Sequence, residues 1–117
     1  LLPINSELTS VMKKLNRTVL FQTGAVASCY HSVALMESHL REAEQAIRHG
    51  IRGVDMQSLQ QNLSAARLAA STEEGLLTTL RGDLQAIEQA LTIGLSPRQV
   101  LRQGYMALSK QRFQPAV

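Results

Sequence analysis

Two long series of apolar and small residues constrain the fold of this chain more than any other feature. The first series begins at Leu8 and ends at Ile47, with alternating steps of four and three residues and the polar Gln22 at one of its positions. The second begins at Met56 and ends at Leu91, with Glu73 at one of its apolar positions. Such a repeat places a narrow apolar stripe along a helix, into which a second helix packs. The two series therefore predict two long helices that pack on each other.

The segment between the two series contains signals for the end of one helix and the start of the next. Gly50 can adopt the left-handed conformation that ends a helix. Asp55 is a candidate N-cap, although Ser58 stands where a capping box would have Glu or Gln. Because a short connection makes neighbouring long helices antiparallel, the sequence predicts an antiparallel hairpin.

A third, shorter helix is predicted after the hairpin. Ser96 and Pro97 provide an N-cap and a first-turn proline, and Gln99 follows the cap by three residues. The expected apolar side of this helix consists of Val100, Leu101, Met106 and Leu108.

The predicted fold class is therefore all-α, with a long, coiled-coil-like antiparallel two-helix hairpin followed by a short third helix. We expect a single helical domain over residues 1–117. The helices are expected at about 6–49, 55–93 and 97–112, with the turn at 50–54.

The composition fits helix packing and limits the cellular setting. Hydrophobic residues make up 44% of the chain but aromatic residues only 3%, so the core must consist of aliphatic side chains. Cys29 is the only cysteine and cannot form an internal disulfide, which favours a reducing, cytoplasmic location. No apolar run approaches the roughly 20 residues that span a bilayer, and no signal-peptide pattern is recognised.

The sequence contains no motif for catalysis or for cofactor binding. It lacks a phosphate-binding loop, paired metal-ligand spacing and a nucleophile beside a base. Cys29 and His31 lie on different faces of a helix, and His39 and His49 are separated by roughly 15 Å along the helix axis. We therefore expect no enzyme activity, no catalytic residues, no metal and no cofactor.

Basic residues gather at the open end of the predicted hairpin, where the first helix starts beside the end of the second. Seven of the twelve fall there: Lys13, Lys14, Arg17, Arg98, Arg102, Lys110 and Arg112. One interpretation is binding to an anionic surface, above all lipid headgroups. The alternative is a solvated helix surface with intrahelical ion pairs such as Glu37–Arg41. The net charge of +3 is mild, and no aromatic residues alternate with the basic ones, so no nucleic-acid partner is expected.

Several large apolar residues lie off the predicted seam and need cover from another molecule. The candidates on the hairpin are Leu20, Phe21, Tyr30, Leu35, Leu68 and Leu76. Those on the third helix are Leu101, Tyr105 and Leu108. These residues predict self-association or binding to related helical subunits.

Three features together suggest a family. They are the glycine turn at His49–Gly50, the spacing of Leu77, Leu80, Leu84 and Ile87, and the stretch from Val100 to Lys110. Over roughly Leu35 to Lys110 the chain resembles the core of ESCRT-III subunits, the charged multivesicular body proteins.

The resemblance implies a non-enzymatic module that polymerises on membranes for remodelling, scission or sealing in endosomal sorting. It implies that Lys13, Lys14 and Arg17 face the lipid and that residues 97–112 shift between a closed monomer and an open polymer. The implied location is cytoplasmic and peripheral on an endosomal or nuclear-envelope membrane. The alternative function is a helical scaffold or adaptor subunit of a larger complex that binds a partner helix.

Overall fold

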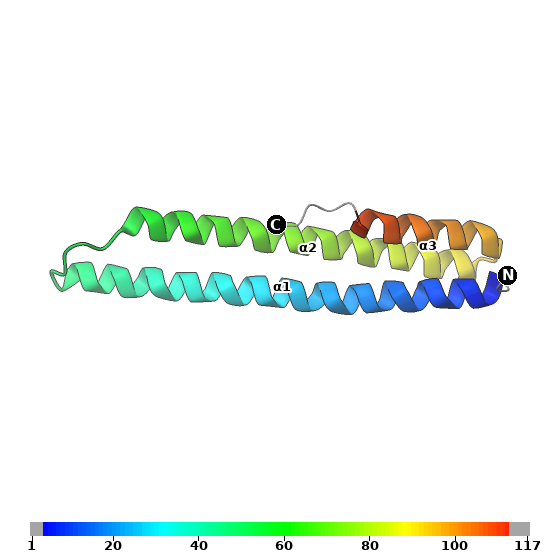
Figure 1. Cartoon of the computed structure of the whole chain (residues 1–117), viewed down its shortest axis with the longest axis horizontal. Coiled ribbons are helices and arrows are strands. Elements are labelled where there is room, and N and C mark those ends of the chain that lie inside the picture. Colours follow the sequence, from blue (N-terminus) through cyan, green and yellow to red (C-terminus); the bar gives the residue numbers. More distant parts are fainter. Residues whose placement is uncertain (1–3, 113–117) are drawn as a thin grey trace. The chain divides into compact units, whose positions relative to one another are not determined.

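The computed structural model describes the backbone of residues 4–112 and the side chains of residues 4–110, and it contains three α-helices (Figure 1). α1 spans Ile4–Arg48, α2 spans Met56–Thr92 and α3 spans Pro97–Arg112. No strand occurs within residues 4–112, so the all-α prediction is confirmed. α1 is very long, at 45 residues. Each helix begins and ends within two residues of its predicted bounds.

Gly50 ends α1 in the conformation that the sequence predicts. Its φ angle is +80°, in the left-handed region that favours glycine. The N–H of Ile51 donates to the carbonyl of Ala46 at 3.0 Å, and the N–H of Gly50 donates to the carbonyl of Ile47 at 3.0 Å. This pair of hydrogen bonds is a Schellman motif, which satisfies carbonyl groups that the last helical turn leaves without partners.

Side chains cap the starts of α2 and α3. Asp55 accepts two hydrogen bonds from Ser58, one from its backbone N–H at 3.0 Å and one from its hydroxyl at 2.7 Å. The hydroxyl bond, followed by the backbone bond, holds the pKa of Asp55 below its ordinary value. The Ser96 hydroxyl oxygen accepts the backbone N–H of Gln99 at 3.3 Å. Both predicted N-caps are therefore confirmed.

The packing divides the chain into two compact units. Among the described residues, unit 1 combines 4–22 with 76–112, and unit 2 consists of 23–75. Unit 1 therefore contains segments of all three helices, and unit 2 contains segments of α1 and α2.

Unit 1 has the larger core, and all three helices contribute to it. The buried residues are Val11, Leu15, Leu80, Ile87, Ala90, Val100 and Ala107. Leu8, Met12, Val19, Leu84, Leu101 and Leu108 pack around them. α3 therefore packs on the segments of α1 and α2 that belong to its own unit.

Small residues bring α3 close to this core. Gly104 is buried, and a Cβ atom at this position would lie 2.6 Å from Cγ1 of Val11. Val100, Gly104 and Ala107 share one face of α3, since residues three and four positions apart lie on the same side of a helix. Met106 was expected on the apolar side, but it is 58% exposed. At about 100° per residue it lies about 120° from Val100 and about 160° from Gly104 around the axis of α3.

Unit 2 has a smaller core between its segments of α1 and α2. The buried members of the cluster are Val33, Leu63 and Ala70. Cys29, Met36, Leu40 and Ala66 pack against them. The two apolar series of the sequence therefore supply most of the buried residues of this unit.

The last residues of the two apolar series are exposed and not buried. Ile47 and Leu91, their last members, are 46% and 41% exposed. In α2 the buried residue is Ala90 instead of Leu91. An α-helix has 3.6 residues per turn, so its buried face drifts away from a strict heptad repeat.

The close contact of Gly104 with Val11 predicts different effects for two glycine-to-alanine substitutions. Gly104→Ala forces a Cβ atom against Val11, and such overpacking costs about 1–3 kcal/mol. Gly82→Ala is the matched control, because Gly82 lies inside α2 and a Cβ atom there would meet nothing within 4 Å. Alanine raises helix propensity by about 1 kcal/mol at both positions.

We therefore expect Gly82→Ala to raise the free energy of unfolding. The free energy of unfolding of Gly104→Ala should be lower than that of Gly82→Ala by about 1–3 kcal/mol. Urea unfolding followed by far-ultraviolet circular dichroism measures both values. Val11→Ala should reduce the penalty of Gly104→Ala in a double-mutant cycle. Equal effects of the two glycine substitutions would contradict the packing of α3 on α1.

Candidate functional site

Positive charge is concentrated in unit 1. Its segments contain eight basic and three acidic residues, a formal net charge of +5. Unit 2 contains four basic and six acidic residues, a formal net charge of −2. All seven basic candidates named from the sequence belong to unit 1. Arg81, which was not among the candidates predicted from the sequence, is also exposed, on α2 in the same unit.

The outer face of α1 in unit 1 carries three cations and two large apolar side chains. Lys13, Lys14, Arg17, Leu20 and Phe21 are all exposed. Leu20 and Phe21 are 73% and 80% exposed, respectively. Helical spacing places Leu20 and Phe21 about one turn beyond Arg17 on the same side of α1. We call these five residues the α1 outer face.

The sequence assigned the members of the α1 outer face to two different roles. Lys13, Lys14 and Arg17 were predicted to bind anions, and Leu20 and Phe21 were predicted to mediate assembly. The structure brings the two sets onto one surface, opposite the buried residues of α1 in the same unit.

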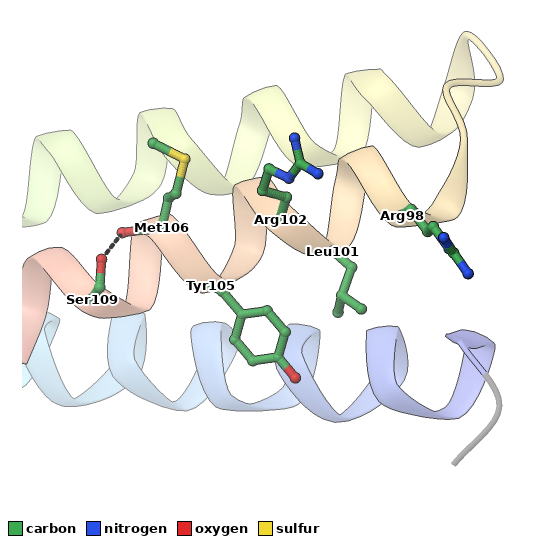
Figure 2. A pocket seen from close by; sticks show the side chains of 6 residues that line it. All are labelled: Arg98, Leu101, Arg102, Tyr105, Met106 and Ser109. Atoms are coloured by element: carbon green, nitrogen blue, oxygen red, sulfur yellow. Dashed lines mark hydrogen bonds between the residues drawn. The ribbon is translucent and has the colours of Figure 1, made fainter. Parts of the chain in front are cut away.

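The exposed side of α3 forms a shallow pocket (Figure 2). Its lining residues are Arg98, Leu101, Arg102, Tyr105, Met106 and Ser109. Figure 2 shows Leu101 and Tyr105 pointing to the side of α1. The Ser109 hydroxyl donates to the backbone carbonyl of Met106 at 2.8 Å. The pocket thus combines two exposed guanidinium groups with an apolar wall.

Lys110 has a partner inside unit 1. Its Nζ atom lies 3.1 Å from Oδ2 of Asp83, which belongs to α2. Half-exposed ion pairs of this kind contribute about 0–1 kcal/mol. The side chain of Arg112 lies outside the described residues. The basic candidates with described, exposed side chains are therefore divided between the outer sides of α1 and α3.

The apolar assembly candidates differ in their exposure. Leu20, Phe21, Tyr30, Leu35, Leu68 and Tyr105 are exposed. Leu76, Leu101 and Leu108 are half-buried, and the last two pack against the core of unit 1. Ile93, which was not among the candidates predicted from the sequence, is 77% exposed beside Gly94 in the turn between α2 and α3. Its position next to Gly94, a candidate helix-ending glycine, is the sequence feature that could have indicated its exposure.

Each tyrosine donates a hydrogen bond to a glutamate of its own unit. In unit 1 the Tyr105 hydroxyl donates to Oε1 of Glu7 at 2.6 Å, which joins α3 to α1. In unit 2 the Tyr30 hydroxyl donates to Oε2 of Glu74, which joins α1 to α2. These hydrogen bonds raise the pKa of both tyrosines above 10.0, and desolvation and the glutamate charge act in the same direction.

α1 also meets a composition criterion for membrane segments. It contains an 18-residue window with a mean hydropathy of 1.2, of which 11% is buried. No Lys, Arg, Asp or Glu occurs between Arg17 and Glu37. The expectation that no helix would be long and apolar enough to cross a bilayer is therefore wrong. The core helices of soluble proteins and signal sequences meet the same criterion, so length and composition alone do not make α1 a membrane span.

Side chains suited to metal binding do not cluster in the part of the chain that the structure describes. No group of three or more His, Cys, Asp or Glu residues there is placed to hold a metal ion. Cys29 is a free thiol, half-buried against the core of unit 2.

Titration of the two tyrosines tests their hydrogen bonds to glutamate. With Tyr30→Phe, phenolate absorbance reports Tyr105 alone, because the chain has two tyrosines. We expect its midpoint above 10.0 in the folded protein and close to the ordinary value in denaturant. Because the pKa of Tyr105 is higher in the folded protein than in the unfolded one, the stabilisation that the hydrogen bond contributes is fully present below pH 10.0. That contribution is lost as the pH rises through the folded pKa.

Glu7→Gln should move this midpoint down, because the amide carries no charge that disfavours the phenolate. Glu88→Gln is the matched control, since it removes a carboxylate of the same unit that is not the partner of Tyr105. An unchanged midpoint in Glu7→Gln would contradict the contact between α3 and α1.

The two units differ in charge, and the outer sides of α1 and α3 in unit 1 present cations beside apolar groups. Comparison with protein-family models, with curated proteins and with solved structures gives no match.

Proposed function

We propose that the chain is a non-enzymatic assembly module that polymerises on anionic membranes and acts in their remodelling, scission or sealing, like the core of ESCRT-III subunits. The observation that carries this proposal is the net charge of +5 in unit 1, with exposed apolar side chains among its cations. The proposed location is the cytoplasmic surface of an endosomal or nuclear-envelope membrane.

In this proposal α1 and α2 form the antiparallel, coiled-coil-like hairpin that the two apolar series predict. Contacts inside unit 2 support it. A short connection, residues 49–55, joins the two helices, and such connections make neighbouring helices antiparallel. The hydrogen bond from Tyr30 to Glu74 links residues 44 positions apart in the sequence across the two helices.

Electrostatics supports an anionic membrane as the surface on which the module acts. Each basic residue close to an anionic leaflet gains about 1 kcal/mol. Lys13, Lys14 and Arg17 together therefore supply about 3 kcal/mol on the α1 outer face. Arg98 and Arg102 on α3 can add to this attraction in the same unit.

The opposite charges of the two units support polymerisation. Unit 1 at +5 attracts a surface at −2, so unit 1 of one copy is complementary to unit 2 of another. A contact between two different surfaces of the same chain repeats from copy to copy and generates rings or open filaments.

A second candidate function is a helical scaffold or adaptor that binds a partner helix. Apolar side chains exposed on unit 2 favour it, because this unit is acidic and lipid attraction does not account for them. Leu68 is 70% exposed and Leu35 is 47% exposed. Amphipathic helices bind to such surfaces through residues spaced three and four positions apart.

Charge reversal on the α1 outer face tests the membrane proposal. We expect Lys13→Glu with Lys14→Glu and Arg17→Glu to weaken binding to phosphatidylserine vesicles by about 100-fold or more, since three attractive contacts are lost. Co-sedimentation across a range of vesicle and salt concentrations measures the binding. Binding of the unchanged chain should fall as the salt concentration rises.

The matched control reverses Arg41, Arg52 and Arg67, which are exposed residues of unit 2. This triple variant has the same total charge change and should keep most of the vesicle binding. Equal losses in the two triple variants would mean that total charge, and not unit 1, determines binding. Filaments or rings on vesicles in negative-stain images support the polymer, whereas discrete particles without vesicle binding support the adaptor.

A further inference from the structure

We propose that Leu20 and Phe21 insert into the headgroup–acyl boundary of an anionic bilayer while Lys13, Lys14 and Arg17 contact its phosphate groups. This inference rests on the proposed function and identifies the lipid-contacting residues of the same site. It assigns Leu20 and Phe21 to lipid contact, whereas the sequence assigned them to assembly.

The exposure of Leu20 and Phe21 provides the first argument. Adjacent residues of an α-helix differ by about 100°, yet both side chains are outside the core, at 73% and 80% exposure. Transfer of large apolar side chains out of water is favourable, and the free energy gained is roughly proportional to the apolar area that is removed from water. Both side chains therefore gain from an apolar environment that the core of unit 1 does not give them.

The charge pattern along α1 identifies the chemistry of that environment. No aspartate or glutamate occurs between Glu7 and Glu37, so the three cations beside Leu20 and Phe21 have no acidic neighbour on this stretch of α1. Helices that lie in a bilayer interface combine Lys and Arg with Phe and Leu, and bury their apolar side chains about 5–10 Å deep. An anionic bilayer offers the complementary negative surface and an apolar interior together.

A second copy of the chain fits the α1 outer face less well. Two copies joined through this face would bring three cations against three, and like charges across an interface are unfavourable. Two large apolar side chains are also few for a stable protein interface, which buries about 1,000 Å² or more.

A membrane-spanning α1 fits the packing less well than an inserted pair of side chains. A spanning α1 would have to leave the core of unit 1, where Val11 and Leu15 are buried, and the core of unit 2, where Val33 is buried. Insertion of Leu20 and Phe21 from the exposed side leaves both cores intact.

Tryptophan fluorescence tests the insertion directly, because the chain contains no tryptophan. Phe21→Trp places a reporter on the α1 outer face. Leu68→Trp is the matched control, since Leu68 is 70% exposed but belongs to the acidic unit 2. With phosphatidylserine vesicles we expect the emission of Phe21→Trp to shift to shorter wavelength and to be quenched by lipids brominated near the headgroup. The emission of Leu68→Trp should change little.

A double variant measures how much the apolar pair contributes. Leu20→Ser with Phe21→Ser should weaken vesicle binding by about tenfold or more, because two apolar side chains no longer enter the lipid. Since both residues are exposed, the helix content measured by circular dichroism should stay unchanged.

Four outcomes would overturn the insertion. Salt-sensitive pelleting with no emission change in Phe21→Trp overturns the insertion and leaves the proposed function standing. No pelleting even at low salt overturns both. A blue shift that depends on protein concentration without vesicles means that a second copy covers the face. Strongest quenching by lipids brominated at the acyl-chain ends means that α1 spans the bilayer.

Discussion

Burial of one side of α1 is the constraint on which the rest of the structure depends. A helix of 45 residues in water owes its stability mainly to tertiary packing of an apolar face, not to helix propensity. α1 contributes Val11 and Leu15 to the core of unit 1 and Val33 to the core of unit 2. Within unit 1, the buried residues of α1 lie on one side of the helix, and the exposed Lys13, Lys14, Arg17, Leu20 and Phe21 lie on the other. The α1 outer face is a direct consequence of this division.

The two cores differ in how they are built. In unit 1 the third helix adds Val100 and Ala107 to the core, and Gly104 lets α3 approach Val11 closely. In unit 2 only segments of α1 and α2 contribute. The basic unit is thus the one with three helices and the larger buried cluster. A more extensively packed scaffold holds its exposed side chains more firmly in position.

The ends of the helices could be predicted from sequence because they depend on local chemistry. Gly50, Asp55 and Ser96 act on backbone groups within a few positions of themselves. The buried face of α3 could not be predicted in the same way, because it depends on Gly104 meeting Val11 from a distant part of the chain. A search for large apolar residues overlooks a face made of small ones.

The grouping of the basic residues could be predicted from the sequence, but the contacts that the side chains of unit 1 make could not. Counting basic residues along the predicted hairpin placed seven of them in one region, and all seven belong to unit 1. The partners of the acidic residues were not predictable, because Tyr105 and Glu7 are 98 positions apart and Lys110 and Asp83 are 27 apart.

These contacts matter for the surface that unit 1 presents. Two of the three carboxylates in unit 1, Glu7 and Asp83, are engaged in contacts that hold α3 to α1 and to α2. Glu88, the third carboxylate, is exposed, so the positive charge of unit 1 comes from its eight basic residues against three acidic ones. Glu7 and Asp83 thus help to fix the third helix, whereas a different set of residues supplies the exposed positive charge of unit 1, namely Lys13, Lys14, Arg17, Arg98 and Arg102.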